Sequence, residues 1–446
     1  MKKKLTMAFL VTILAGVVLS DDTTDRYDNW PQWRGPLATG ESPTGNPPIE
    51  WSETKNVRWK VPIPGLGKST PVIWGDRIFL TTSIPLDRTL PEGERPVPTE
   101  DPRGQHRDVV HPDQIFAVEV LAINRDDGDI VWRKRLREEF PHEGSHKDGT
   151  FASGSIVTDG EHVYAYFGSR GVYCLDLDGE LQWEKDLGDL VMRRGFGEGS
   201  SPAIHNDKLI VLWDHQGQSF IIALDKRTGK ELWRTDRDEI SSWTTPFVVE
   251  HAGTTQVVTN ATGRVRSYDV ETGELIWESG GTTLNAIPSP VGGDGMVFVT
   301  AGFRGSDLKA IRLSSARGDV TETEALAWRY DRDTPYVPSP LLYENTLYVL
   351  KSNSGILTAF ESRTGDKLYG PVRLDGVMNV YASPVAAAGR IYIVGRDGNT
   401  LVLAHGPEHE VLSLNSLDDG FDASPAISGE DLFLRGSTYL YRIAEP

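Results

Sequence analysis

The stretch IIALDKRTGKELW, residues 221–233, carries the pattern that decides the fold of this chain. One apolar run ends at Asp225, and a second begins after Gly229 and finishes at Trp233. Apolar residues on both sides of an Asp-x-x-Thr-Gly turn are typical of two antiparallel strands, with glycine supplying the positive φ of the turn. The stretch therefore predicts a tight β-hairpin that ends in a tryptophan.

The same hairpin pattern recurs along the chain. It is found as LAINRDDGDIVW at 121–132, VYCLDLDGELQW at 172–183, VRSYDVETGELIW at 265–277 and LTAFESRTGDKLY at 357–369. Trp328 ends a degenerate copy with an insertion, and Tyr369 replaces tryptophan in the last of these stretches. Self-similarity at a fixed period indicates a repeat protein.

A second landmark precedes each hairpin: a hydroxyl residue, usually followed by proline, that opens an apolar run. It occurs at Thr70, Ser155, Ser201, Thr245, Ser289, Ser339, Ser383 and Ser424, with Ile156 in place of proline at the second site. From the second site onward the spacing is 41–50 residues. Proline is tolerated at the first residue of a strand. Two strands before the hairpin and two within it make four per unit, which is the pattern of a propeller blade.

Eight units predict an all-β, eight-bladed β-propeller of four-stranded antiparallel blades over residues 57–446. The last unit ends at Pro446 without a fourth strand, whereas an unassigned strand, NVRWKV, lies at 56–61. We expect this N-terminal strand, with Trp59, to complete the last blade, because a closed ring leaves no strand edge exposed. Residues 21–56 are rich in Pro and Gly and are expected to form an extended segment held by its aromatic residues.

The N-terminus predicts export. Residues 1–20 combine Lys2, Lys3 and Lys4 with an apolar run at 7–19, which is typical of a signal peptide and too short for a membrane span. We expect a periplasmic or secreted monomer. No cysteine follows the apolar run, so no lipid anchor is predicted, and the single Cys174 is expected to be a small core residue. A net charge of −18 disfavours nucleic-acid binding.

The Ala-x-Asp-x-x-Thr-Gly-x-x-x-Trp signature of residues 223–233 resembles the repeat of pyrroloquinoline-quinone-type (PQQ-type) eight-bladed propellers. The resemblance implies that the aromatic residue of each repeat docks between adjacent blades, a role it assigns to Trp59, Trp132, Trp183, Trp233, Trp277, Trp328 and Tyr369. Quinoprotein dehydrogenases of this family carry a vicinal cysteine pair beside the quinone. A chain with one cysteine lacks that pair, so no PQQ and no other cofactor is predicted.

Two further branches are relevant to function. The propeller subunit of the outer-membrane barrel-assembly machinery is a non-catalytic lipoprotein scaffold, and this chain lacks the lipid-carrying cysteine. The opening WPQWRGP, residues 30–36, is more similar to a group of uncharacterised exported bacterial propellers.

Loop chemistry points to one face of the predicted ring. Loops between blades, and loops between the second and third strands of a blade, share a side and are not repetitive. Varied residues on a repetitive scaffold favour a binding site. The predicted ligand-binding residues are His146, Arg193, Asp214, His215, Trp243, Arg264, Arg304, Tyr336 and Arg396.

Arginines and aromatic rings in such loops suit an anionic saccharide, because guanidinium pairs with carboxylate and rings stack on sugar faces. No metal centre is predicted, because His106, His111, His142 and His146 show no recognisable ligand spacing. The preferred hypothesis is a non-catalytic binding or scaffold protein that takes a protein partner or an anionic saccharide. The alternatives are a lyase- or hydrolase-type enzyme acting on an anionic glycan at the channel mouth, and a quinone-dependent oxidoreductase.

Overall fold

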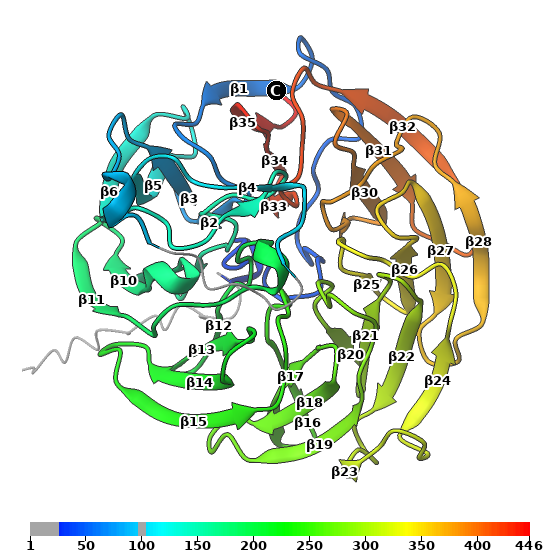
Figure 1. Ribbon diagram of the computed structural model, residues 1–446. Coiled ribbons are helices and arrows are strands. Elements are labelled where there is room, and N and C mark those ends of the chain that lie inside the picture. Colours follow the sequence, from blue (N-terminus) through cyan, green and yellow to red (C-terminus); the bar gives the residue numbers. More distant parts are fainter. Residues whose placement is uncertain (1–25, 97–103) are drawn as a thin grey trace, which may run out of the picture.

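Each repeat folds into one four-stranded antiparallel sheet, and eight such sheets surround a central axis (Figure 1). The computed structural model describes residues 26–96 and 104–446. The eight sheets confirm the predicted eight-bladed propeller. The predicted signal peptide lies outside the described residues. Within those residues, no helix has the length and apolar character needed to cross a membrane.

The blades follow the chain in order, with the innermost strand first. They are built from β2 (Val72–Trp74), β3 (Arg77–Pro85), β5 (Phe116–Asn124) and β6 (Ile130–Glu139); β8 (Val157–Thr158), β9 (His162–Tyr166), β10 (Val172–Asp176) and β11 (Leu181–Lys185); β12 (Ala203–His205), β13 (Lys208–Trp213), β14 (Ser219–Asp225) and β15 (Glu231–Arg237); and β16 (Phe247–His251), β17 (Thr254–Thr259), β18 (Arg264–Asp269) and β19 (Leu275–Gly280).

The second half of the ring repeats this order. It contains β20 (Val291–Gly293), β21 (Met296–Ala301), β22 (Asp307–Arg312) and β24 (Leu326–Tyr330); β25 (Leu341–Tyr343), β26 (Thr346–Leu350), β27 (Ile356–Glu361) and β28 (Lys367–Arg373); β29 (Val385–Ala387), β30 (Arg390–Val394), β31 (Asn399–Ala404) and β32 (Val411–Ser416); and β33 (Ala426–Ser428), β34 (Asp431–Arg435), β35 (Tyr439–Ile443) and β1 (Val57–Pro62). Three 3₁₀ turns, η1 (Glu92–Glu94), η2 (Gly168–Arg170) and η3 (Arg193–Gly195), lie in loops.

The N-terminal strand closes the ring, as predicted. Strand β1 pairs antiparallel with β35, with Trp59 opposite Arg442 and Val61 opposite Leu440. The last blade thus combines the two ends of the chain, which lie far apart in sequence, and Figure 1 shows them side by side. This pairing covers the edge that β35 would otherwise expose.

A belt of hydrogen bonds joins the innermost strands. In seven of the eight junctions, the backbone N–H of the hydroxyl residue that opens one blade donates to the side-chain oxygen of the equivalent residue in the next blade. The seven N···O distances are 2.8–3.1 Å, and the bonds run Thr70→Ser155→Ser201→Thr245→Ser289→Ser339→Ser383→Ser424. The recurring Ser/Thr of the sequence is therefore an inter-blade acceptor, a role that the strand pattern did not predict.

The junction between the last and first blades uses different contacts. The Thr70 hydroxyl has no hydrogen-bond partner among the described residues. Instead, the buried Arg435 of the last blade donates to the carbonyl and the hydroxyl of Ser69. Burial lowers the pKa of Arg435 to about 9, so this side chain remains cationic near pH 7. A salt bridge of 2.6 Å from Lys68 to Asp422 crosses the same seam.

Tryptophans on the outer strands form a second set of contacts between neighbouring blades. The indole N–H of each donates to a backbone carbonyl in the turn of the following blade, at 2.8–3.0 Å, in the pairs Trp59–Arg125, Trp132–Leu177, Trp183–Lys226, Trp233–Val270 and Trp328–Ser362. The turn glycine lies against the ring: a Cβ on Gly229 would be 2.7 Å from Trp183. Of these five residues Trp233 is buried, at 9% exposure, and the others are half-buried.

Trp277 and Tyr369 depart from this arrangement. The Trp277 N–H donates to Gln256 of its own blade, and the side chain is fully buried. The insertion before β24 explains the difference, because its short strand β23 (Gly318–Asp319) returns to pair in parallel with β19. Tyr369 packs against His409 of the following blade, with ring centroids 5.8 Å apart.

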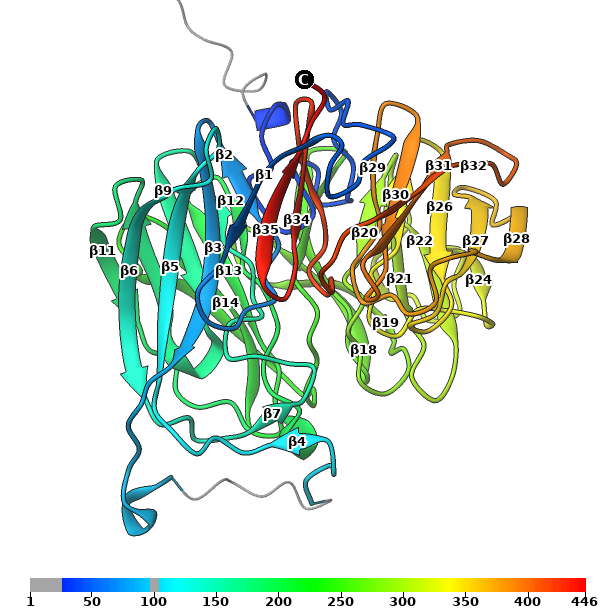
Figure 2. The same cartoon turned by 90° about the horizontal axis from the view of Figure 1, so that it is seen from above.

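The N-terminal segment closes one end of the axis. Figure 2 shows residues after 26, in dark blue, on the face opposite β4 (Val109–Val110) and β7 (Ser145–His146). Arg34 is buried and donates at 2.8–2.9 Å to the carbonyls of Thr39, Pro340 and Pro384. Burial lowers the pKa of Arg34 to about 9. The segment is therefore more than the extended lead-in predicted from sequence, because it places a buried cation among three carbonyls at the axis.

The insertion in the first blade covers part of the other face. Strand β4 pairs with β7, and Figure 2 shows this ribbon projecting from the ring. The loops at this end of the axis are the non-repetitive ones identified from sequence.

The tryptophan contacts between blades predict a measurable loss of stability. Trp233→Ala removes a buried ring and its bond to the Val270 carbonyl, and large-to-small truncations of this kind cost about 3–5 kcal/mol. Leu232→Ala is the matched control, because Leu232 is 43% exposed and should cost less than about 0.5 kcal/mol. Denaturant unfolding measures both. Equal effects of the two substitutions would contradict the inter-blade role of Trp233.

The belt makes a separate prediction at Ser289, whose hydroxyl accepts the Thr245 N–H at 2.8 Å. Ser289→Ala leaves that N–H without its acceptor and should cost about 1–3 kcal/mol. Ser289→Thr keeps the hydroxyl, as Thr70 and Thr245 do naturally, and should be close to wild type. Thermal melts compare the three proteins, and a threonine variant as unstable as the alanine variant would contradict the belt bond.

Candidate functional site

A pocket of about 420 Å³ lies at the end of the axis that the insertion covers. Trp33, from the N-terminal segment, contributes to its lining, and its indole N–H lies 3.4 Å from the Ser424 hydroxyl. The other lining residues come from the loops between blades and between second and third strands. The N-terminal segment thus closes the inner end of the pocket, and the loops form its walls.

Aromatic side chains form two of the walls. Phe196 and Trp243 lie with ring centroids 6.3 Å apart, and the Trp243 N–H donates to the Gly197 carbonyl at 2.7 Å. In a second pair, Phe303 and Tyr336 stack with ring centroids 4.8 Å apart and planes at 25°. All four line the pocket, so a ligand there meets flat apolar surfaces from three blade junctions and from one loop within the fifth blade.

A third wall is ionic. Asp422 accepts from Lys68 at 2.6 Å and from Arg396 at 2.5 Å, and Arg396 also donates to Asp148 at 2.9 Å. The guanidinium lies over the Tyr381 ring, 4.1 Å from its centroid. Burial raises the pKa of Asp148, but the hydrogen bond and charge of Arg396, together with His146 and Tyr381, outweigh it and hold that pKa below its ordinary value. Burial and Asp148 raise the pKa of Tyr381 to about 12. Each of these charges is already compensated by a protein partner.

Belt hydroxyls line the pocket as well, namely Ser155, Ser201, Thr245, Ser383 and Ser424. Each oxygen accepts a backbone N–H from the preceding blade. Because the acceptor side of each hydroxyl is used in this way, its own proton is available to donate. The pocket is therefore ringed by hydroxyl donors held in place by the fold.

The structure brings some of the predicted residues together and separates others. His146, Trp243 and Tyr336 line the pocket, and Arg396 supports the ionic wall from behind. Arg193, Asp214, His215, Arg264 and Arg304 do not line it. The face was identified from the blade register, but the register does not say which loop residues turn toward the axis.

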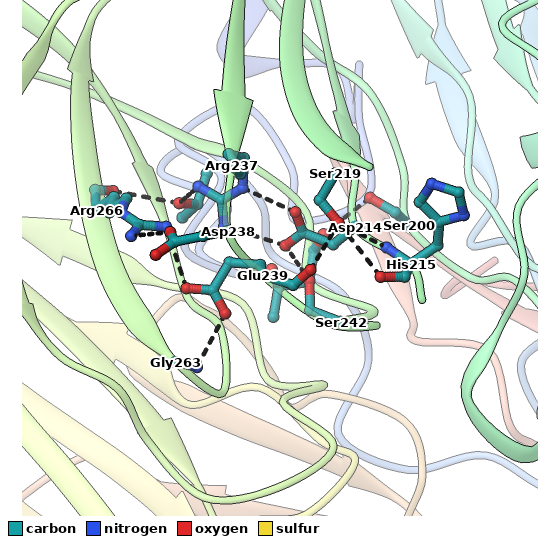
Figure 3. Close-up of polar contacts among 12 residues, drawn as sticks. Ser200, Asp214, His215, Ser219, Arg237, Asp238, Glu239, Ser242, Gly263 and Arg266 are labelled. Carbon is teal, nitrogen blue, oxygen red and sulfur yellow. Dashed lines mark hydrogen bonds and ion pairs between the residues drawn. The ribbon is translucent and has the colours of Figure 1, made fainter. Parts of the chain in front are cut away.

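Asp214 and His215 are part of the interior of their blade (Figure 3). Asp214 accepts hydrogen bonds from Nε and Nη2 of Arg237, at 2.7 and 3.1 Å, and from the Ser242 hydroxyl at 2.7 Å. Both ionic side chains are fully buried. The His215 ring accepts the Val191 N–H at Nδ1 and donates from Nε2 to the Gln218 carbonyl. These residues therefore support loops instead of facing a ligand.

The three remaining arginines also lie outside the pocket. Arg193 is buried within η3. Arg264 pairs with Asp319 at 3.2 Å, so it links one blade to the β23 insertion of the next. Arg304 is exposed and lies over Phe303, 5.3 Å from the ring centroid. The arginine-rich funnel expected for an anionic ligand is thus not formed by these residues.

Several lining residues were missed from sequence: Trp33, Lys68, Phe196, Phe303, Tyr381 and Asp422. One signal was available, because the WPQWRGP stretch at 30–36 is unusually aromatic for a lead-in segment. The others lie in loops without a repeating pattern, and nothing local distinguishes them from solvated residues.

Comparison with known proteins gives the family. A family model described as outer membrane protein assembly factor BamB matches residues 117–280 and 217–444, which together extend over most of the chain. The chain belongs to this family. It is 24% identical over 341 residues to the outer membrane protein assembly factor BamB of Yersinia pestis, covering 72% of this chain and 79% of the relative. It is also 25% identical over 275 residues to the uncharacterised protein RP232 of Rickettsia prowazekii (strain Madrid E), covering 57% and 58% of the two chains.

Solved structures agree on the BamB-type fold. BamB from Moraxella catarrhalis superposes with a TM-score of 0.52 at 16% identity, covering 82% of this chain and 99% of that one. The quinohemoprotein alcohol dehydrogenase from Comamonas testosteroni gives a TM-score of 0.57 at 10% identity, with coverage of 94% and 81%. These likenesses establish a shared PQQ-like propeller, and identities this low say nothing further about ligands.

The buried His215 predicts a pH effect. Burial lowers the pKa of His215, because the charged ring would be desolvated. A proton at Nδ1 would also face the Val191 N–H, which now donates to that atom. Unfolded His215 binds a proton near pH 6.5, while the folded protein does not, so stability present above pH 6.5 is lost as the pH falls toward the folded pKa. His215→Gln should flatten this dependence, although His146 and His205, whose pKa values burial also lowers, retain part of it.

Thermal melts between pH 5 and 8 measure the difference between wild type and the glutamine variant. The ring resonances of His215 in NMR spectra report its pKa directly. A pKa at or above 6.5, or parallel stability curves for the two proteins, would contradict this environment.

Proposed function

We propose that this protein is a non-catalytic binding propeller of the bacterial envelope, and that the pocket at the axis holds a saccharide. An envelope location is supported by the predicted signal peptide and by membership of the BamB family. The observation that carries the binding role is the pocket itself, closed at one end by Trp33 and walled by rings from several blades.

The charges of the pocket favour binding over catalysis. Acid–base catalysis needs a free donor and a free acceptor within reach of the substrate. Here Asp422 and Asp148 are each held by Arg396, and Glu198 accepts from Ser169 and Arg170. Carboxylates fixed in this way are poor proton carriers, which argues against a lyase or hydrolase that works through a pair of carboxylates.

The lining also indicates the kind of ligand. Flat rings such as Trp243 and Tyr336 suit the C–H faces of a sugar, and hydroxyl donors such as Ser155 and Ser201 suit its oxygens. Lys68 and Arg396, the cations beside the pocket, are both paired with Asp422. We therefore favour a neutral saccharide over the anionic one expected from the sequence. The proposal includes no quinone, because the chain has only Cys174.

A scaffold that binds a protein partner is the second candidate. It is supported by the family, whose description is that of an assembly factor. In that case the partner would contact the loops of the insertion face or the outer strands, and the pocket could receive one of its side chains.

Calorimetry against a panel of neutral and acidic oligosaccharides tests the saccharide proposal. Trp243→Ala should weaken binding by about 2 kcal/mol, or roughly 30-fold in Kd, because one stacking wall is lost. Met378→Ala is the control: Met378 is 73% exposed in an inter-blade loop and does not line the pocket. Melting curves check that both variants fold. The proposal fails if no saccharide binds, and the pocket assignment fails if Trp243→Ala binds as well as wild type.

A further inference from the structure

Three potential metal ligands meet at the rim of the pocket. The ligand-capable atoms of His106, Asp108 and His146 all lie within 4.8 Å of one another. Both histidines line the pocket. The two come from segments 40 residues apart in sequence, and only the fold brings them together.

The backbone holds these residues firmly in place. Strand β4 pairs with β7, with Val109 opposite His146, and the Lys147 N–H donates to the Asp108 carbonyl at 2.8 Å. The His106 N–H donates to the carbonyl of Arg194, and the His146 N–H to that of Phe196, both at 3.1 Å. The ribbon and the neighbouring loop thus fix the spacing of the three side chains before any ion is present.

The side chains themselves are accessible and suited to coordination. Their exposed fractions are 31% for His106, 27% for Asp108 and 28% for His146. The imidazole ring centroids are 6.4 Å apart with their planes tilted by 34°, and Phe196 packs against both rings.

The two carboxylates near the imidazole rings, Asp108 and Asp148, are each held by a cation. Lys147 donates to Oδ1 of Asp108 at 3.1 Å, whereas Oδ2 lies 3.7 Å from Nδ1 of His106. A second carboxylate, that of Asp148, lies 3.6 Å from Nδ1 of His146 and is anchored by Arg396. Asp108 can therefore supply one oxygen to an ion. The orientation of the two rings is set by backbone N–H groups: that of Asp108 donates to Nδ1 of His106 at 3.3 Å, and that of Asp148 to Nδ1 of His146 at 3.2 Å.

We propose that His106, Asp108 and His146 bind a divalent first-row transition-metal ion, of which zinc fits best, at the rim of the pocket. Two imidazoles and one carboxylate are ligands of Zn²⁺ and its neighbours, whereas Ca²⁺ and Mg²⁺ prefer oxygen alone. Ligand atoms around zinc lie about 3–3.5 Å apart, so binding draws these half-exposed side chains inward by about 1 Å. Three protein ligands leave a position for water or a ligand, and the histidines place it beside the pocket.

Metal titration of the metal-free protein tests this site directly and needs no saccharide. ZnCl₂ by calorimetry, and CoCl₂ by its visible absorption, should each report one equivalent bound per chain. His146→Ala and Asp108→Asn should each weaken binding at least about tenfold. His111→Ala is the matched control, because His111 is an exposed histidine of the same insertion and outside the cluster, and it should bind as wild type does.

The pH dependence gives a second readout. Zinc affinity should fall as the pH is lowered, because a metal ligand must be deprotonated and protons compete with the ion. Asp108→Asn changes little volume, so it remains informative if an alanine variant is unstable. Several weak equivalents in place of one, binding that survives both ligand substitutions, or an equal loss in His111→Ala would each overturn the proposal.

Discussion

The structure depends on the bond from a backbone N–H of one innermost strand to the Ser or Thr hydroxyl of the next. Most of the residues that open the innermost strands are buried, and a buried N–H must find an acceptor within the protein. A hydroxyl at each blade opening supplies it, and the following proline has no N–H that would need one. Seven copies of this bond set the blades at a common spacing around the axis.

The eighth junction shows what the ring needs where the belt is interrupted. Between Ser424 and Thr70 the chain must join its two ends, and there it uses Arg435 on Ser69, Lys68 on Asp422, and the β1–β35 ladder. A buried guanidinium is costly unless its donors are occupied. Arg435 therefore stabilises the contact between the last and first blades only when the two are aligned so that it reaches Ser69. The salt bridge between Lys68 and Asp422 also forms part of the pocket wall, so closure of the ring and the shape of the site depend on one interaction.

Repetition explains what could and could not be predicted from sequence. The hairpin of residues 221–233 recurs often enough to establish the blades, their number, the closing strand and the face that carries variable loops. The contacts of those loops are not periodic. His106 meets His146 through the β4–β7 ladder, and Trp33 reaches the axis because Arg34 binds carbonyls of two distant blades. Such pairings depend on the finished ring, so no local pattern predicts them.

Asp214 and Arg396 illustrate the same limit within one class of loop. Each follows the second strand of its blade, and both were expected to face a ligand. Asp214 lies beside Arg237, which removes its charge from the surface, whereas Arg396 has Asp148 and Asp422 on either side and stays near the pocket. The partner that each side chain meets in the folded ring, and not the residue type, decides which charge remains at the site.

The closed inner end of the axis has a consequence for binding. Arg34 and Trp33 occupy the axis from one face, so a molecule in the pocket enters and leaves past the insertion on the other. His106 and His146 stand on that route, and they are held by the β4–β7 ribbon and by the loop that contains Arg194 and Phe196. The propeller blades therefore provide the aromatic side chains and hydroxyls that line the pocket. The short β4–β7 ribbon sets the chemistry at its entrance. Changes in the insertion can alter that entrance without disturbing the belt on which the fold depends.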